Sequence, residues 1–273
     1  LRIKEMDSKL RVLALGAGVQ STTLALMIEK GEVPMVDAAI FSDTMAEPRR
    51  VYSHLDWLEK KLSYPIYRVS NGNLKQDTID AINNNTRVAM STFYTRNKVT
   101  GKKGMMIRQC TQDYKIAPLI KEIRRLLGVG YRKQVPPGTN VTQLFGISSD
   151  EASRMRTAPK KYLTYDYPLV DLKMSRKDCL DWMKKNNYPK PPRSACTFCP
   201  FHSNEEWKYI KEDEQEWKEV IEFDEKIRNG WGKVKDNLYL HRSGEPLSEA
   251  NLEKSKDDQL NLFENDCEGQ CGV

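Results

Sequence analysis

The stretch that most constrains the fold lies at residues 11–24 and reads RVLALGAGVQSTTL. Its apolar run, Val12–Leu15, is short and leads directly into a turn, which is typical of a central strand in a parallel sheet. Gly16 and Gly18 allow a tight turn and a close backbone approach. The residues that follow begin a helix, and a helix N-terminus attracts anions. The stretch predicts a strand, a turn and a helix around an anion site, although such a turn also occurs as a plain connection without a ligand.

Apolar and amphipathic segments alternate after this unit until about residue 190. Further strands are expected at 36–44, 64–69, 141–148 and 162–170, with helices at 21–30, 47–62, 74–82, 108–127 and 175–186. Alternating strands and helices form parallel sheets that helices cover on both faces. We therefore predict a three-layer α/β domain over residues 1–200, with a mainly parallel five-stranded sheet. Residues 201–273 are expected to form a mainly helical and irregular extension, with one helix at 204–228.

Composition argues against a membrane protein. Hydrophobic residues make up 39% of the chain and charged residues 30%, and no apolar run approaches the roughly 20 residues that a membrane-spanning helix needs. The N-terminus lacks the apolar core of a signal peptide. We expect a cytoplasmic protein with no membrane partner. The oligomeric state stays open, with a homo-oligomer as one outcome.

The positive charge is unevenly distributed. The formal net charge is +6, and lysines and arginines are concentrated in residues 97–134, whereas the tail after Glu245 is acidic. Residues 84–107 are polar, basic and irregular, so we expect a substrate-facing flap there. A basic cluster is compatible with nucleic acid or another anionic substrate, but a solvated helix face explains it as well.

The most specific local pattern is the pair Cys196 and Cys199, followed directly by Pro200. This spacing places two thiolates on one metal ion or cluster, and proline after the second cysteine occurs in iron–sulfur ligand loops. Zinc uses the same spacing, so the pattern leaves the metal open. A redox dithiol is a further alternative.

Two cysteines are short of a complete ligand set. Cys110 is the natural third ligand, because Arg108 and Lys115 nearby in sequence favour its thiolate. The fourth ligand is open between Cys267, Cys271, His202 and an unfilled position. Two other residues of metal-binding type are expected not to be ligands: Cys179 on the apolar side of a helix, and His54 as a surface or packing histidine.

Together these features resemble the phosphoadenosine phosphosulfate (PAPS) reductase family. That family belongs to the adenine-nucleotide α-hydrolase-like superfamily, which also contains the PP-loop ATP pyrophosphatases. The resemblance covers about residues 10–200, and its motifs follow the family's order. The matching segments are the turn at 16–21, Asp43 and Thr44 with Glu47, the segment from Cys110 to Leu119, the segment from Gly146 to Arg154, and the pair Cys196 and Cys199.

The resemblance implies a role for each matching segment. Lys115 and Arg154 are expected to stabilise phosphate charge in the reaction. Adenine nucleotide and Mg²⁺ would bind at the turn and at the ends of the strands. The residues expected to bind the nucleotide are Gly16, Ala17, Gly18, Gln20, Ser21, Thr22, Asp43, Thr44 and Gly146.

Several positions depart from the family's patterns. Assimilatory reductases carry their nucleophilic cysteine in a C-terminal Glu-Cys-Gly-Leu-His motif, whereas the tail here reads DCEGQCGV. ATP-dependent thiolases usually carry Ser-Gly-Gly-x-Asp-Ser, and Gln20 replaces that aspartate, as in many sulfonucleotide reductases. Ser148 stands where the family usually has arginine, and Cys110 where cluster-bearing reductases of adenosine phosphosulfate (APS) have two adjacent cysteines.

Three functions follow as hypotheses. The first is ATP-dependent, pyrophosphate-releasing sulfur transfer to tRNA or DNA from a sulfur donor, with a [4Fe–4S] cluster on Cys110, Cys196 and Cys199. The second is reduction of PAPS or APS to sulfite by a thiol reductant, with Cys267 or Cys271 as nucleophile. The third is a non-catalytic nucleotide-binding or zinc-stabilised module. The basic segment at 97–108 and the basic helix after it favour a nucleic-acid acceptor.

Overall fold

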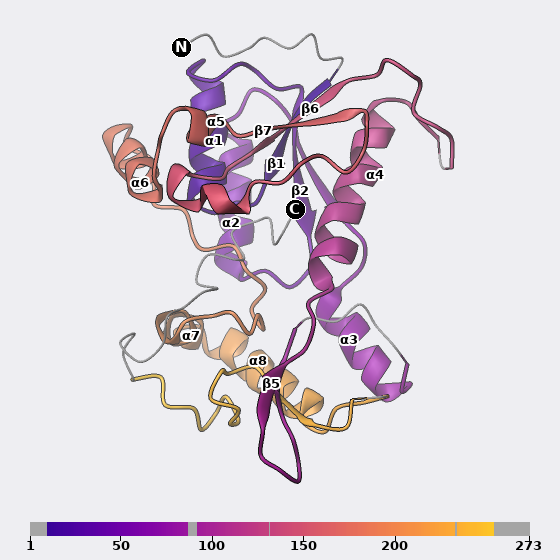
Figure 1. Ribbon diagram of the computed structural model, residues 1–273. Helices are drawn as coiled ribbons and strands as arrows, with labels where there is room; N and C mark the ends of the chain where they lie inside the picture. The colour runs from indigo at the N-terminus through magenta and orange to yellow at the C-terminus, as the bar shows by residue number, and fades with distance from the viewer. Residues whose placement is uncertain (1–9, 87–91, 131, 233, 254–273) are drawn as a thin grey trace.

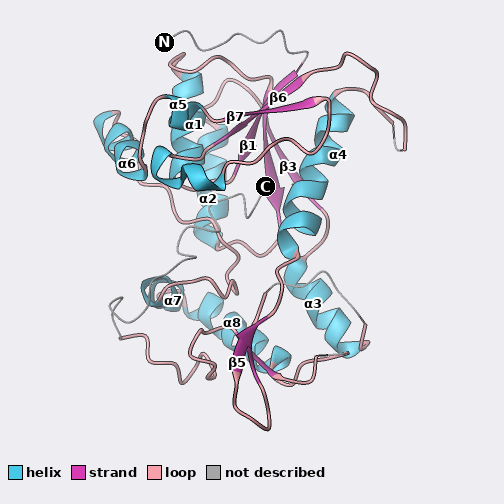
Figure 2. Ribbon diagram, viewed as in Figure 1, coloured by secondary structure: helices cyan, strands magenta, loops and turns pink. Residues whose placement is uncertain are grey.

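The computed structural model describes residues 10–86, 92–130, 132–232 and 234–253 (Figure 1). Two lobes are visible: a parallel sheet with its helices, and a second group of helices around a small antiparallel sheet (Figure 2). None of the helices in these ranges combines the length and apolar character that a bilayer crossing requires.

The first lobe is built on a five-stranded sheet with the order β3-β2-β1-β6-β7, in which every neighbouring pair is parallel. Its strands are β1 (Leu10–Leu15), β2 (Ala38–Asp43), β3 (Ile66–Ser70), β6 (Val141–Phe145) and β7 (Leu163–Asp166). The predicted glycine-turn strand is β1, and it lies in the centre, where Leu13 is in register with Ala39 of β2 and Leu144 of β6. Strands buried on both faces read as continuous apolar runs, which explains why the sequence predicts them well.

Helices cover both faces of this sheet, as predicted. On one face, α1 (Val19–Glu29), α2 (Arg49–Glu59) and α6 (Arg176–Lys185) share a core with β1 and β2, and this core includes the fully buried Cys179. On the other face, α4 (Ala117–Leu126) packs Leu119 and Ile123 onto the sheet. A π-helical turn, Thr111–Ile116, leads into α4, a 3₁₀ turn, Ser149–Arg154, follows β6, and the short α5 (Pro168–Asp171) follows β7.

The second lobe joins segments from both halves of the chain. It contains α3 (Leu74–Asn83), α7 (Asn204–Lys211), α8 (Glu214–Ile227) and an antiparallel sheet with the order β5-β4-β8. Its strands are β4 (Tyr94–Arg96), β5 (Lys103–Met105) and β8 (Asn237–Tyr239). Phe93, Phe198, Trp207 and Phe223 share its core. Described residues after 200 therefore pack against described residues between 74 and 110 and close a common core with them.

Three predicted elements differ in the structure. The strand expected at 162–170 ends at Asp166, and Pro168–Asp171 form the helix α5. The single helix expected at 204–228 is two helices, because the Asp213 carboxylate accepts the backbone N–H groups of Gln215 and Glu216 and starts a new helix there. The flap expected at 84–107 contains a β-hairpin, since β4 pairs with both β5 and β8. The start of the helix expected at 175–186 is confirmed, since Ser175 caps α6 in a capping box with Asp178.

Candidate functional site

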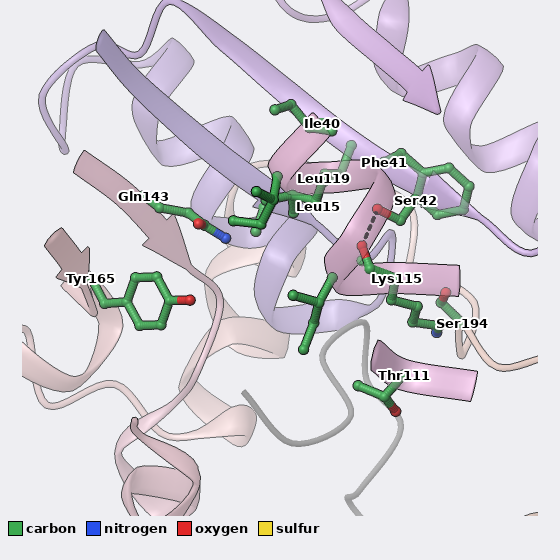
Figure 3. A pocket seen from close by; sticks show the side chains of 14 residues that line it. Leu15, Ile40, Phe41, Ser42, Thr111, Lys115, Leu119, Gln143, Tyr165 and Ser194 are labelled. Atoms are coloured by element: carbon green, nitrogen blue, oxygen red, sulfur yellow. Dashed lines mark hydrogen bonds between the residues drawn. The ribbon is translucent and has the colours of Figure 1, made fainter. Parts of the chain in front are cut away.

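The candidate site lies where the chain reverses direction across the sheet. From β1 the chain moves outward to β2 and β3, then returns to place β6 on the other side of β1. Ligands of such sheets bind beyond the carboxyl ends of the strands at this point. A small cavity of about 30 Å³ occupies the position here (Figure 3). Its lining includes Leu15 and Gly16 of the β1 end, Ser42 of β2, Gln143 of β6, Tyr165 of β7, and Thr111 and Lys115 of the π-helical turn.

The predicted nucleotide loop lies against the end of β6. An added Cβ on Gly146 would lie 2.5 Å from the Ser21 Cα, so only glycine lets the two segments pack this closely. Gly18 is the N-cap of α1 with a φ of −88°, and the left-handed backbone of the turn belongs to Ala17, with a φ of 60°. The loop residues and Gly146 are thus brought together, although the strained position is Ala17 rather than a glycine.

Polar side chains of the first turn of α1 are buried and partly paired. The Ser21 hydroxyl donates to the Gly18 carbonyl at 3.3 Å, and the Gln20 amide donates to the Ser148 hydroxyl at 3.4 Å. The other amide atom of Gln20, Oε1, is buried without a hydrogen-bond partner in the described part of the chain. Thr22 Oγ1 lies 3.0 Å from His54 Nε2. His54 is a packing histidine, as predicted, since it is buried and stacks on Trp57.

The polar end of β2 contacts two different neighbours. Asp43 Oδ1 accepts the Tyr52 hydroxyl at 2.9 Å and the Met45 backbone N–H at 2.7 Å. The Thr44 hydroxyl lies 3.1 Å from Cys196 Sγ. This contact brings the predicted nucleotide-binding pair next to the predicted cysteine pair, although they are far apart in sequence.

Lys115 belongs to a buried charged group beside the cavity. Its Nζ lies 3.9 Å from Glu47 Oε1, and the Ser194 hydroxyl donates to Glu47 Oε2 at 3.1 Å. Burial raises the pKa of Glu47, and the Lys115 charge opposes that rise. The Ser42 hydroxyl donates to the Lys115 carbonyl at 2.8 Å, which fixes the π-helical turn against β2. A cation held this way beside a ligand cavity suits the stabilisation of phosphate charge.

Arg154 lies apart from the cavity lining. Its guanidinium pairs with Glu151 Oε2 at 2.7 Å, and both side chains are largely buried. The neighbouring carboxylate therefore compensates the charge that was expected to bind phosphate. The phosphate role of Arg154 stays a prediction, and this geometry gives it less support than Lys115 has.

The three predicted metal ligands share one core but do not form a ligand set. Cys110, Cys196 and Cys199 all belong to the second lobe's core. Among the residues that the structure describes, however, no three histidine, cysteine or acidic side chains are grouped so that they could hold a metal ion. Burial raises the pKa of the Cys196 thiol, and the Glu47 charge raises it further.

Of the remaining proposed ligands, His202 is the one that the structure describes. His202 Nε2 lies 2.9 Å from the Cys196 carbonyl oxygen, so this ring nitrogen is already hydrogen-bonded. Cys267 and Cys271 lie outside the described residues. The observed arrangement therefore does not fit a cluster on these residues, and the metal stays a prediction that metal analysis must decide.

Sequence reasoning missed most of the cavity lining, including the polar residues Thr111, Gln143, Tyr165 and Ser194. Gln143 Oε1 and Thr111 Oγ1 are buried and make no hydrogen bond within the described ranges. Gln143 is only 2% exposed, and Figure 3 shows its amide and the Tyr165 hydroxyl pointing toward the middle of the site. Little in the sequence signals Gln143, since it follows another polar residue, Thr142, in the middle of β6.

Comparison with known proteins gives a distant structural similarity and no family. No protein-family model matches the chain, and no curated protein matches it. Among solved structures, the chain is similar to PAPS reductase from Candida auris, solved as a phosphate complex. The identity is 12%, the match covers 68% of this chain and 76% of that one, and the TM-score is 0.43. Because this similarity is low, the α/β assignment rests on the observed sheet, and no residue role is taken from that protein.

Proposed function

We propose that the chain is a PAPS-reductase-like enzyme that uses an adenine nucleotide, and that it catalyses ATP-dependent sulfur transfer to a nucleic acid. The observation that carries this proposal is the cavity at the reversal of the sheet. Lys115 and Gly16 of the glycine turn line it, and this turn leads directly into the N-terminus of α1. This is where nucleotides bind in open parallel sheets, with phosphate at the helix N-terminus.

Unpartnered polar atoms support a heterocyclic base in the cavity. Gln143 Oε1 is an acceptor, and the Thr111 hydroxyl donates or accepts. Adenine offers an exocyclic amine as donor and ring nitrogens as acceptors, which match these two groups. The present volume of about 30 Å³ holds about one water molecule, so the wall formed by the π-helical turn must move outward when a base enters.

The proposed reaction forms an adenylated acceptor. An acceptor carbonyl oxygen attacks the α-phosphate of ATP and pyrophosphate leaves; sulfur from a separate donor then displaces AMP. Lys115 and the α1 amides stabilise the negative charge of the first step. Mg²⁺, when bound with the nucleotide, neutralises phosphate charge, and Asp43 is the nearby carboxylate suited to contact it. No step is assigned to an iron–sulfur cluster, because the described cysteines do not form its ligand set.

One observation favours the second candidate, thiol-dependent reduction of PAPS or APS to sulfite. Gln20 occupies the loop position where thiolases have a magnesium-binding aspartate, and its amide is buried against Ser148. The loop therefore offers no carboxylate at that position. A reductase needs no nucleotide-bound Mg²⁺, so this substitution suits it better than it suits a thiolase.

Product analysis separates these functions. The protein is incubated with ATP, Mg²⁺, a sulfide donor and RNA or DNA, and separately with PAPS or APS and a thiol, while pyrophosphate and sulfite are measured. Our proposal predicts pyrophosphate release, at least about a hundredfold slower in Lys115→Ala and unchanged in Lys177→Ala, whose side chain is exposed on α6. Sulfite release instead would establish the reductase, and tight nucleotide binding with neither product would indicate a non-catalytic module.

A further inference from the structure

A cluster of positively charged side chains lines one groove. The groove has a volume of about 1130 Å³ and lies between α4, the loop after α4 and the loop leading into β7. Seven lysines and arginines line it, with Glu122 as the one carboxylate in that lining. This surplus of six equals the formal net charge of the whole chain, +6. The seven cations are Lys121, Arg124, Arg125, Arg132, Lys133, Arg156 and Lys160.

Two arginines hold the walls of the groove in place, and a third neutralises its carboxylate. Arg124 donates to the carbonyl oxygens of Gly130 and Lys133, which fixes the loop after α4. Arg156 donates to the carbonyl oxygens of Ser153 and Met155 at 2.9 Å, which fixes the opposite wall. Arg125 pairs with Glu122 and neutralises it. The groove is therefore formed before any ligand binds, which lowers the entropic cost of binding.

Lys121, Lys133 and Lys160 have a different role, because they are exposed and form no ion pair with any described residue. Lys121 is on α4, Lys133 on the following loop and Lys160 on the facing loop, so ammonium groups stand on both walls. Such an arrangement fits a chain of phosphate groups that runs between the walls.

The floor of the groove indicates which nucleic acid fits. Ile116, Ile120 and Val129 line it together with Tyr165. Duplex DNA presents phosphates on its outside and would leave this apolar surface uncovered. The bases of a single strand are exposed and stack on apolar and aromatic side chains. Ile116, Ile120 and Tyr165 also line the small cavity, so the groove adjoins the proposed nucleotide site.

We propose that this groove binds a single-stranded segment of RNA or DNA, with Lys121, Lys133 and Lys160 on its phosphates and its bases on the apolar floor. The groove thereby brings the acceptor next to the nucleotide cavity. The role of the bound strand as sulfur acceptor rests on the proposed function, whereas strand binding by the groove does not.

The β4–β5 hairpin offers a matched control. It carries Lys98, Lys102 and Lys103. These lysines belong to the basic segment at 97–108, which favoured a nucleic-acid acceptor in the sequence analysis. Figure 1 shows this hairpin at the far end of the second lobe, whereas α4 lies beside the parallel sheet. Replacing either set of three lysines by alanine removes the same charge from the chain, so a difference between the two variants reports position rather than net charge.

The test is fluorescence anisotropy with a labelled 20-nucleotide strand, as RNA and as DNA, and with the matching duplex. The groove variant Lys121→Ala/Lys133→Ala/Lys160→Ala should bind either single strand on the order of tenfold to a hundredfold more weakly than wild type. The slope of log affinity against log salt should become about 2 smaller, because three phosphate contacts are lost. The hairpin variant should bind within about twofold of wild type. RNA and DNA titrations show which backbone is preferred.

Two results would overturn the inference: equal losses in both triple variants, or tighter binding of the duplex than of the single strand by wild type. Circular dichroism confirms that the exposed substitutions leave the fold intact. Pyrophosphate release is measured in parallel. If the strand binds through the groove but no pyrophosphate is released, the proposed function is wrong and the inference about the groove stands. If pyrophosphate is released but the groove variant binds the strand as well as wild type does, the proposed function stands and the inference is wrong.

Discussion

His54 lies beneath the first turn of α1, with Nε2 3.0 Å from the Thr22 hydroxyl and its ring 5.3 Å from that of Trp57. Burial lowers its pKa from 6.5 to about 4, so the folded chain holds it neutral. The unfolded chain takes up a proton on this residue at a higher pH than the folded chain does. Stability is therefore lost as the pH falls from about 6.5 to about 4. The proposed phosphate loop thus depends on an uncharged imidazole.

Replacing this residue should reduce the acid sensitivity of the fold. His54→Gln keeps a polar group near Thr22 but removes the titration, so the variant should escape a loss of up to about 3 kcal/mol between pH 7 and pH 4. Urea unfolding at several pH values measures the difference. His241, whose pKa burial also lowers to about 4, is present in both proteins and gives a common background. Parallel stability curves for wild type and variant would contradict this role of His54.

Among the secondary-structure elements, the boundary that the sequence failed to show is set by a side-chain cap. The start of α7 was predicted, and Ser203 forms a capping box with Glu206 there, whereas Asp213 caps α8 within the predicted helix. Apolar residues recur at helical spacing across this boundary, so periodicity alone predicted one helix. Glycine or proline in the sequence would have signalled a break. Without them, a capping aspartate within a continuous apolar pattern reads like any exposed polar residue of one helix.

The difference between local sequence signals and tertiary contacts also explains which parts of the site were predictable. The glycine turn, Asp43 and Thr44 lie at the ends of strands whose common edge follows from parallel pairing, and the structure brings them together. Gln143 and Ser194 reach the site through tertiary packing, and no short motif in the sequence contains them. The cysteine spacing correctly predicted that Cys196 and Cys199 lie in one core. Metal binding also requires the side chains to be grouped around one point, and the spacing does not determine this.

The break between α7 and α8 gives a direct test at this scale. Asp213→Ala removes the acceptor for two backbone N–H groups and should lower the free energy of unfolding by about 1 kcal/mol. Asp213→Asn should retain most of the stability, because asparagine caps helices equally well. Glu212→Ala, at the adjacent position outside the cap, serves as the control. Equal urea midpoints for Asp213→Ala and Glu212→Ala would show that the carboxylate does not cap α8.

At the scale of the whole molecule, the two lobes divide the chain differently from the predicted boundary at residue 200. Leu74, Phe93 and Cys196 belong to the same core as Trp207 and Phe223. The β4–β8 pairing adds a backbone link between the two parts of the chain. The cavity end of the first lobe also depends on the second, since Thr44 contacts Cys196 and Glu47 contacts Ser194.

Truncation tests whether residues 1–200 fold alone. A chain that ends at residue 203 loses the cover that α7 and α8 give to Phe93 and Phe198, whose side chains are fully buried. Exposing a core of this size costs more than the 5–15 kcal/mol that stabilises a typical domain, at roughly 1.5–3 kcal/mol for each large side chain. We expect the 1–203 chain to lack a cooperative thermal transition and to expose apolar surface to a fluorescent dye.

A chain that ends at residue 253 is the matched control, because it retains the whole described second lobe. It should melt cooperatively within a few degrees of the full chain. A cooperative transition in the 1–203 chain would instead establish residues 1–200 as an independent domain. The same control lacks Cys267 and Cys271, the proposed nucleophiles of the reductase alternative. Retention of pyrophosphate release in the 1–253 chain would therefore favour sulfur transfer, and selective loss of sulfite release would favour the reductase.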